Sequence, residues 1–259
     1  MGNGNASRIA NPRHGRLPVC ATVVLSRCAR RAFNHSISVE VERRLVHRAF
    51  LMKRTIAFLG VLFIAGSLVG QTIGLPTPQK SGGMPLMEAL AKRSTARAFD
   101  SKDLSPQQLS SLLWAAFGVN RPDGKRTAPS ARNFQETDIY VLLKQGAYIY
   151  TAKSNKLDLI AAEDIRALGG SQAFVKDAPV TLVFVADLSK MGGGSNEGKM
   201  NTANIDVGYI SQNVYLFCAS EGLVTGARGS VDRNALGPKL KLRPDQSIIL
   251  AQSAGYPKL

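Results

Sequence analysis

The sequence predicts an α+β domain in roughly the last two-thirds of the chain. Ser105 and Pro106 are typical of a helix N-cap and first helical position, and apolar residues then recur at helical spacing from Leu109 to Phe117. A continuous apolar run within 179–187 predicts a buried strand. Helical and strand patterns do not alternate regularly along the chain, which favours α+β over a doubly wound α/β fold.

One expected helix, at 201–221, differs from the others because its residues are apolar nearly all round. We expect it to be buried on several sides, at the centre of the fold or of a dimer, and to end at Gly222. The other expected helices span 85–92, 105–117, 163–168 and 233–240, and the expected strands span 138–144, 146–152, 156–160, 179–187, 223–227 and 247–254.

The segments before residue 84 are predicted to lie outside this domain. Residues 52–70 combine a short basic start, 14 uncharged residues and small residues at the end, which is typical of a secretory signal peptide and too short for a membrane span. We interpret Met52 as the true start and residues 1–51 as a doubtful extension, with a genuine basic extension as the alternative. Residues 71–83 are rich in Pro, Gly, Ser and Thr and predict a linker. The mature protein is therefore expected in the periplasm or outside the cell, without a stable membrane span.

The formal net charge of +15 would suit a nucleic-acid-binding protein, but the distribution of charge argues against that class. Residues 1–51 hold nine Arg, no Lys and two acids, hence +7. Lys53 and Arg54 add +2, which leaves +6 for the remaining residues. Their basic side chains are scattered among 16 acids, so we interpret them as a solvated surface and expect no nucleic-acid partner.

The distribution of His and Cys excludes several kinds of catalysis. His14, His35 and His47 all precede the signal segment, and the predicted domain holds a single Cys, Cys218. The domain therefore has no Ser-His-Asp or Cys-His chemistry, no His- or Cys-cluster metal site and no internal disulfide. We expect Cys218 to be a core residue and no metal to be bound. An enzyme of this composition uses carboxylates, Lys, Tyr or Arg, or relies on a cofactor.

Three short segments carry candidate ligand-binding groups. Residues 92–99 combine two Arg forks and two hydroxyls, which suit a phosphate monoester and sugar-like hydroxyls, or alternatively form a basic helix end. Residues 128–135 combine small residues with Ser, Asn and Gln, which suit a flat ligand or an ordinary polar loop. Residues 225–230 place two Gly after an expected strand, where backbone N–H groups face a ligand or form a plain turn.

Two further features concern the long helix and the segment before it. Asp206, Gln212 and Asn213 are polar residues that would be costly if buried without partners, so we expect them to hydrogen-bond loop backbone. The Gly-rich stretch 192–194 is either a mobile lid over a ligand pocket or a surface loop.

In their order and spacing, these segments resemble the nitroreductase family of FMN-binding proteins. The resemblance covers 84–259 and rests on Arg-Ser-Thr-x-Arg-x-Phe, Pro-Ser-Ala-x-Asn-x-Gln and Asp-x-Gly-x-x-x-Gln-Asn-x-x-Leu, followed by Glu-Gly-Leu. Residues 114–120 and the Gly-Tyr-Pro-Lys ending look closest to compact members related to azoline-forming peptide dehydrogenases. The family implies a three-layer fold with a central, mostly antiparallel sheet flanked by helices.

The resemblance also implies a set of FMN-binding residues. In the family, the first motif holds the phosphate and ribityl chain, which implies Arg93, Ser94, Thr95 and Arg97 here. The Pro-Ser-Ala-x-Asn loop flanks the flavin, which implies Pro129, Ser130, Ala131 and Asn133. A loop after the long helix gives a backbone N–H to flavin N5, implying Arg228 and Gly229, and a C-terminal basic residue, here Lys258, completes the phosphate site. No catalytic side chain is implied, since flavin N5 carries the chemistry.

The activity implied by the resemblance is transfer of a hydride or two electrons through flavin N5 to a small electron-poor acceptor of nitroaromatic, quinone or enone type. The family also implies NAD(P)H as donor and a homodimer, with reduced-flavin charge offset by N–H groups and cations, the Arg228 side chain among them. The predicted export conflicts with NAD(P)H, which is a cytoplasmic donor. Two alternatives remain open: a flavin-dependent tailoring dehydrogenase acting on a peptide or other precursor, and a non-catalytic flavin-binding protein.

Overall fold

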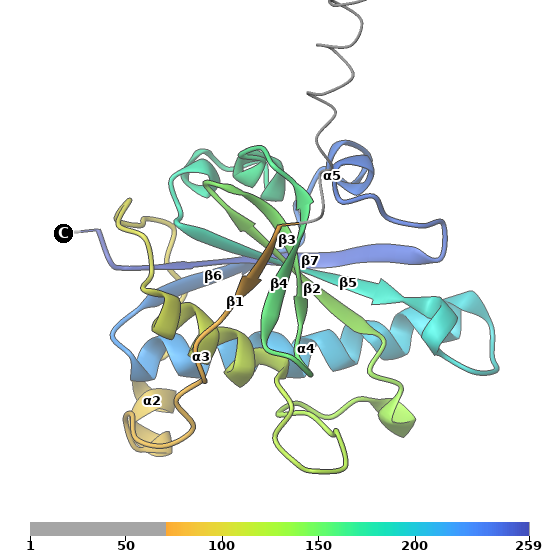
Figure 1. Ribbon diagram of the computed structural model, residues 1–259, viewed down its shortest axis with the longest axis horizontal. Coiled ribbons are helices and arrows are strands. Elements are labelled where there is room, and N and C mark those ends of the chain that lie inside the picture. Colours follow the sequence, from red (N-terminus) through yellow and green to blue (C-terminus); the bar gives the residue numbers. More distant parts are fainter. Residues whose placement is uncertain (1–70, 259) are drawn as a thin grey trace, which may run out of the picture. The chain divides into compact units, whose positions relative to one another are not determined.

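The computed structural model describes residues 71–258, which form three layers (Figure 1). One seven-stranded sheet has the order β1-β4-β3-β2-β5-β7-β6, and all of its strand pairings are antiparallel. Helices α3 and α4 pack on one face, α2 packs against α4, and α5 covers the other face. The predicted α+β class and three-layer architecture are confirmed. The doubtful extension 1–51 and the predicted signal peptide 52–70 lie outside the described residues.

The elements agree closely with the expected ones. Each strand predicted from the sequence is found within one residue of its expected bounds. The helices are α2 (Leu86–Lys92), α3 (Pro106–Phe117), α4 (Asn196–Ser220) and α5 (Arg233–Lys239), with 3-10 helices η1 (Ala131–Asn133), η2 (Arg166–Gly169), η3 (Ala173–Lys176) and η4 (Leu188–Lys190). The strands are β1 (Thr72–Gly74), β2 (Thr137–Leu143), β3 (Gly146–Thr151), β4 (Lys156–Ala161), β5 (Val180–Asp187), β6 (Val224–Arg228) and β7 (Gln246–Gly255).

Strand β5 lies at the centre of the sheet and is buried on both faces. Leu182 and Phe184 face the cluster formed with α3 and α4, whereas Val183 and Val185 face the cluster formed with α5. This is why the sequence of β5 is a continuous apolar run rather than an alternating one. Each such fully buried side chain contributes about 1.5–3 kcal/mol through the area it removes from water.

Helix α3 begins and ends at the expected residues. Ser105 accepts a hydrogen bond from the backbone N–H of Gln108, whose side chain in turn accepts the N–H of Ser105. This capping box satisfies two amide groups that the first helical turn leaves free. Gly118 ends the helix, and its N–H donates to the Trp114 carbonyl.

Helix α4 crosses the sheet and begins five residues earlier than expected, because Ser195 caps it by accepting the N–H of Gly198. Gly222 follows its last turn at φ 68°, a left-handed conformation that favours glycine. The inner face is buried, but Ile205 and Tyr209 remain 59% and 48% exposed. Within one chain, α4 is therefore not buried on as many sides as the sequence predicts. Among the described helices, none combines the length and apolar character that crossing a membrane requires.

Two expectations about local structure are wrong. The expected linker 71–83 is attached to the domain: β1 pairs with the edge of β4, and the N–H of Gln79 donates to Ser111 Oγ at 3.0 Å. The expected helix 163–168 is replaced by the single 3-10 turn of η2 (Arg166–Gly169), which a second glycine, Gly170, follows. A three-residue strand has no periodicity to detect, and consecutive glycines disfavour a helix.

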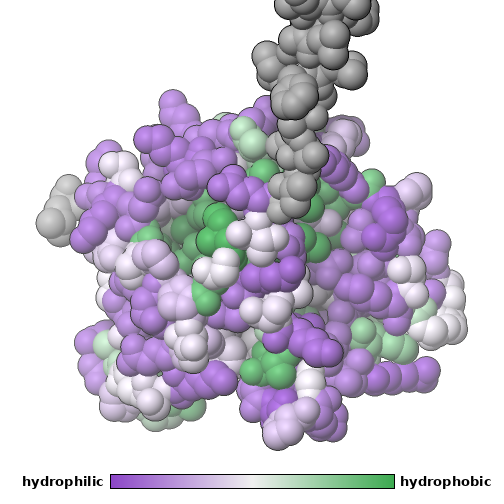
Figure 2. Space-filling model, in the orientation of Figure 1, coloured by the Kyte–Doolittle hydropathy of each residue, from purple (hydrophilic) through white to green (hydrophobic). Residues whose placement is uncertain are grey.

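The surface is mostly polar on the face shown in Figure 2, where hydrophobic residues form small separate areas. Among residues 71–258, the large apolar side chains that are most exposed lie on two helices that pack against each other. They are Leu86, Met87 and Leu90 on α2, and Ile205 and Tyr209 on α4. These two helices therefore carry the apolar surface that a single chain leaves uncovered.

Candidate cofactor-binding site

The first predicted motif runs along the free edge of β6. The backbone N–H of Ala96 donates to the carbonyl of Thr225 at 2.9 Å. A Cβ atom at position 226 would lie 2.5 Å from the Ala96 carbonyl oxygen, so this approach requires glycine there. The edge of the sheet thus fixes the backbone of the motif.

The side chains of this motif remain accessible. Ser94, Thr95 and Arg97 are exposed, and the Arg93 guanidinium lies 5.3 Å above the ring of Tyr215 on α4. Neither Arg93 nor Arg97 pairs with a carboxylate anywhere in residues 71–258. Two unpaired guanidinium groups beside two hydroxyls form a donor set that fits a phosphate monoester.

The C-terminal segment lies beside the same motif. Phe99 forms an antiparallel bridge with Pro257, and the N–H of Asp100 donates to the Tyr256 carbonyl at 3.0 Å. Lys258 is exposed one residue beyond this bridge. The structure therefore brings Lys258 to the side of the sheet where Arg93, Ser94, Thr95 and Arg97 lie.

The second predicted segment is a strained loop held by α4. The Ala131 N–H donates to Asp206 Oδ2 at 2.9 Å, which confirms that Asp206 bonds loop backbone. Ser130 Oγ accepts the N–H of Gln135 at 3.0 Å, while Pro129 is exposed. Three residues here have left-handed backbone conformations that L side chains rarely adopt: Arg132 (φ 50°), Asn133 (φ 55°) and Gln135 (φ 48°). Strain of this kind clusters at ligand sites and persists only where the surroundings hold it.

The other two polar residues of α4 behave differently from Asp206. Asn213 Nδ2 donates to the Ala116 carbonyl at 3.4 Å, so it bonds the backbone of α3 rather than a loop. Gln212 is exposed. Of these three polar residues, Asp206 alone therefore bonds the candidate site loop.

The third predicted segment divides into a buried and an exposed part. Arg228 is 9% exposed, and its Nε and Nη1 donate to the Gly169 carbonyl at 2.8 Å and Ser253 Oγ at 3.0 Å. Burial lowers the pKa of its guanidinium to about 10. The Arg228 side chain thus holds η2 against β6 and β7, whereas the following residue, Gly229, is exposed.

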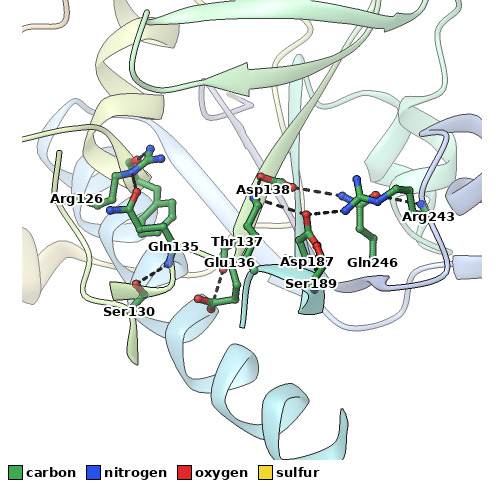
Figure 3. A network of polar contacts seen from close by, with 12 residues as sticks. Arg126, Ser130, Gln135, Glu136, Thr137, Asp138, Asp187, Ser189, Arg243 and Gln246 are labelled. Atoms are coloured by element: carbon green, nitrogen blue, oxygen red, sulfur yellow. Dashed lines mark hydrogen bonds and ion pairs between the residues drawn. The ribbon is translucent and has the colours of Figure 1, made fainter. Parts of the chain in front are cut away.

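Glu136 is a residue of this region that the sequence motifs did not single out. It is 0% exposed at the start of β2, and its Oε2 has no hydrogen-bond partner. The pKa of Glu136 is raised, mainly by burial. The hydrogen bond from the backbone N–H of Glu136 opposes this rise, whereas the Asp206 carboxyl adds to it. Figure 3 shows Glu136 directed away from the group formed by Asp138 and Arg243. Two buried carboxyls, Glu136 and Asp206, therefore lie beneath the strained loop.

Arg126 is a second residue that the motifs missed. Its Nε donates to Gln135 Oε1 at 2.7 Å and its Nη1 to the Phe117 carbonyl at 3.0 Å (Figure 3). The Gln135 side chain in turn donates to Asn133 Oδ1 at 3.0 Å. The left-handed conformation of the loop is thus secured from both sides, by Arg126 and by Asp206.

One chain does not bring the two main segments together. Asp206 holds the loop and Tyr215 holds the first motif, and these residues are nine positions apart on α4. Nine residues make two and a half helical turns, so the two segments lie on opposite flanks of the helix, about 13.5 Å apart along its axis. The exposed Ile205 and Tyr209 lie on the outer face between them.

Comparison with known proteins identifies the family and the fold. Residues 90–256 match the Nitroreductase family. The chain belongs to the nitroreductase family. A candidate nitroreductase of Methanocaldococcus jannaschii is 29% identical over 185 residues, which cover 68% of this chain and 93% of that protein. The family match over residues 90–256 contains every predicted cofactor-binding residue except Lys258.

Solved structures of nitroreductase-family proteins agree with this assignment. The crystal structure of a candidate nitroreductase from Ralstonia eutropha JMP134 is 39% identical, with a TM-score of 0.70, and the match covers 74% of this chain and 92% of that one. An NADPH:FMN oxidoreductase from Vibrio harveyi, solved with NAD+, shares the fold at 18% identity and a TM-score of 0.52, covering 67% and 69% of the two chains.

The cysteine of residues 71–258 is a core residue of this nitroreductase-family domain. Cys218 is buried in the core, as expected, and burial raises the pKa of its thiol to about 12. Within residues 71–258, no group of three or more His, Cys, Asp and Glu side chains is arranged to hold a metal ion.

Replacing Glu136 with Gln should make stability less dependent on pH. A carboxyl whose pKa is raised by folding favours its protonated form in the folded state. The stability of the wild-type protein therefore falls as pH rises from the ordinary value of 4.5 through the raised pKa. Urea unfolding between pH 4 and pH 8 measures the free energy of unfolding. The value for Glu136→Gln minus the value for the wild type should grow with pH and then level off. Glu163→Gln, at an exposed glutamate, is the control, and a difference that stays constant with pH would contradict the prediction.

Proposed function

We propose that this nitroreductase-family protein is an FMN-dependent oxidoreductase that passes two electrons to a small electron-poor acceptor of nitroaromatic, quinone or enone type. The observation that supports this most directly is the donor set at the β6 edge. Arg93 and Arg97 present guanidinium groups without a carboxylate partner there, beside the exposed Thr95 and next to Lys258. The Vibrio harveyi neighbour is described as an NADPH:FMN oxidoreductase, which agrees with the proposed cofactor.

The residues of this chain would bind and orient FMN rather than react. Arg93, Ser94, Thr95, Arg97 and Lys258 would hold the phosphate and ribityl chain, and the loop of Pro129, Ser130, Ala131 and Asn133 would flank the flavin ring. The exposed backbone at Gly229 is the proposed hydrogen-bond donor to N5. FMN, when bound, supplies hydride or two-electron transfer at N5. The buried Arg228 guanidinium contributes positive charge behind that backbone rather than direct contact.

We also propose that a complete site needs two chains. The loop and the phosphate motif lie on opposite flanks of α4, so a homodimer that covers the exposed face of α4 would bring the motif of one chain towards the loop of the other. Ile205, Tyr209 and the apolar residues of α2 supply the uncovered apolar surface for such a contact.

The class of electron donor depends on where the protein is located. We propose that residues 52–70 export the protein to the periplasm or outside the cell. NAD(P)H is a cytoplasmic donor, so an exported protein would take its electrons from another reductant. NAD(P)H remains the donor if the protein stays in the cytoplasm.

The purified protein should carry FMN or take it up, and replacing Arg93 and Arg97 with Ala should weaken that binding. Each guanidinium forms charge-assisted hydrogen bonds worth about 1.5–3 kcal/mol, so each substitution should lower FMN affinity by about tenfold or more. Flavin fluorescence titration measures this effect. Lys92→Ala is the matched control, because Lys92 is already paired with Glu88 at 2.8 Å. A colourless protein that cannot be reconstituted with FMN would contradict the proposed function.

Placing a charge on the outer face of α4 should separate the proposed dimer. Ile205→Asp introduces a carboxylate into apolar surface, so sedimentation should report a monomer and FMN should be retained less well. Asn204→Asp adds the same charge at the neighbouring exposed position and should leave the dimer intact. A wild-type protein that is monomeric and fully loaded with FMN would show that one chain suffices.

Export should leave a defined N-terminus. N-terminal sequencing of the native protein, recovered outside the cytoplasm, should find a start directly after Ser67 or Gly70. A native peptide from upstream of Met52 would show that residues 1–51 are translated and that the proposed start is wrong.

A further inference from the structure

Tyr215 connects the first motif to the strand that leads to Gly229. Its hydroxyl oxygen accepts the backbone N–H of Ala227 at 3.0 Å and lies 3.2 Å from Thr95 Oγ1. Its ring lies beneath the Arg93 guanidinium, 5.3 Å from the guanidinium carbon. One side chain of α4 thus contacts two predicted phosphate ligands and the edge of β6.

Counting protons leaves two arrangements for the hydrogen bond between Tyr215 and Thr95, because either hydroxyl can donate. A phenol has one proton to donate, and an amide N–H can only donate, so Tyr215 accepts from Ala227 and keeps its own proton for another partner. Thr95 Oγ1 is the acceptor within reach. If Tyr215 donates to Thr95, the proton of Thr95 is left to point elsewhere, and Thr95 is exposed. If Thr95 donates to Tyr215 instead, the proton of Thr95 points into the protein.

A phosphate monoester next to Thr95 selects the first of these two arrangements. Its oxygens are acceptors, so a threonine hydroxyl stabilises them only when its proton points outwards. Tyr215 also holds Arg93 at the motif, because the guanidinium that lies over the ring is attracted by its π-electrons.

We propose that Tyr215 is a positioning residue that makes this site prefer a flavin with a terminal phosphate over riboflavin. It does so by turning the Thr95 hydroxyl outwards as a donor and by holding the Arg93 guanidinium over its ring. This inference rests on the proposed function, since it assumes that flavin binds at the β6 edge. It concerns the phosphate end of the cofactor and makes no use of the reaction itself.

Tyr215→Phe tests the proposal, because it removes the hydroxyl and keeps the ring beneath Arg93. The dissociation constants of the full chain for FMN and for riboflavin are measured by flavin fluorescence. Loss of one oriented hydrogen bond should weaken FMN binding by about five- to tenfold, while riboflavin binding changes by less than about twofold. Tyr150→Phe is the matched control, since it also removes a buried hydroxyl contact, the one to Asn155 Oδ1 at 3.1 Å. It should leave the ratio of the two constants unchanged.

Thr95→Val leaves Tyr215 in place, so it supplies an independent measurement if Tyr215→Phe disturbs folding: by itself it should weaken FMN binding by about five- to tenfold and riboflavin binding by less than about twofold. Because Tyr215 acts through Thr95, adding Tyr215→Phe to Thr95→Val should weaken FMN binding by less than about twofold. A Tyr215→Phe protein that loses FMN and riboflavin equally would assign Tyr215 a purely structural role and overturn the inference. Unchanged FMN affinity would overturn it as well. A wild-type protein that binds neither flavin would overturn the proposed function, and the inference with it.

Discussion

The packing of α4 across one face of the sheet is the contact on which the rest of the structure depends. Its inner residues Val207, Ile210 and Val214 close the core beneath β5 and β7. Its two flanks carry the side chains that hold the candidate ligand-binding segments, Asp206 for the strained loop and Tyr215 for the first motif. The spacing of these two residues along one rigid helix therefore sets the distance between the two parts of the site.

The site also contains two buried titratable side chains that lack a full set of hydrogen-bond partners. Arg228 has one guanidinium nitrogen without a hydrogen-bond partner, and Glu136 has one such carboxyl oxygen. Unpaired buried polar groups of this kind usually cost about 1–3 kcal/mol each. Both residues lie at segments that support the proposed flavin contacts, Arg228 before Gly229 and Glu136 beneath the Pro129–Asn133 loop.

The sequence predicts the fold better than it predicts the contacts within the site. Strands such as β5 follow from an uninterrupted apolar run, and α3 follows from the capping residues at Ser105 and Pro106. The order of the motifs likewise places Arg93 and Asn133 in loops. Tyr215 was not singled out, because on an apolar helix a tyrosine is indistinguishable from any other core residue until its hydroxyl partners are known. Arg228 was expected near the ligand, and only the packing of η2 reveals that its side chain faces inwards.

The docking of the first motif on β6 has a consequence beyond ligand binding. An open strand edge is a template for pairing with other chains, and proteins that leave one long and flat tend to aggregate. Here the outward carbonyl of Thr225 and the outward N–H of Ala227 are both taken, by Ala96 and by Tyr215, and at the opposite end the three-residue β1 covers β4. The segment that presents Arg93 and Arg97 therefore also blocks edge-to-edge association of the sheet with other chains. A change that loosens it, at Gly226 for example, would expose the chain to self-assembly as well as weaken its hold on a ligand.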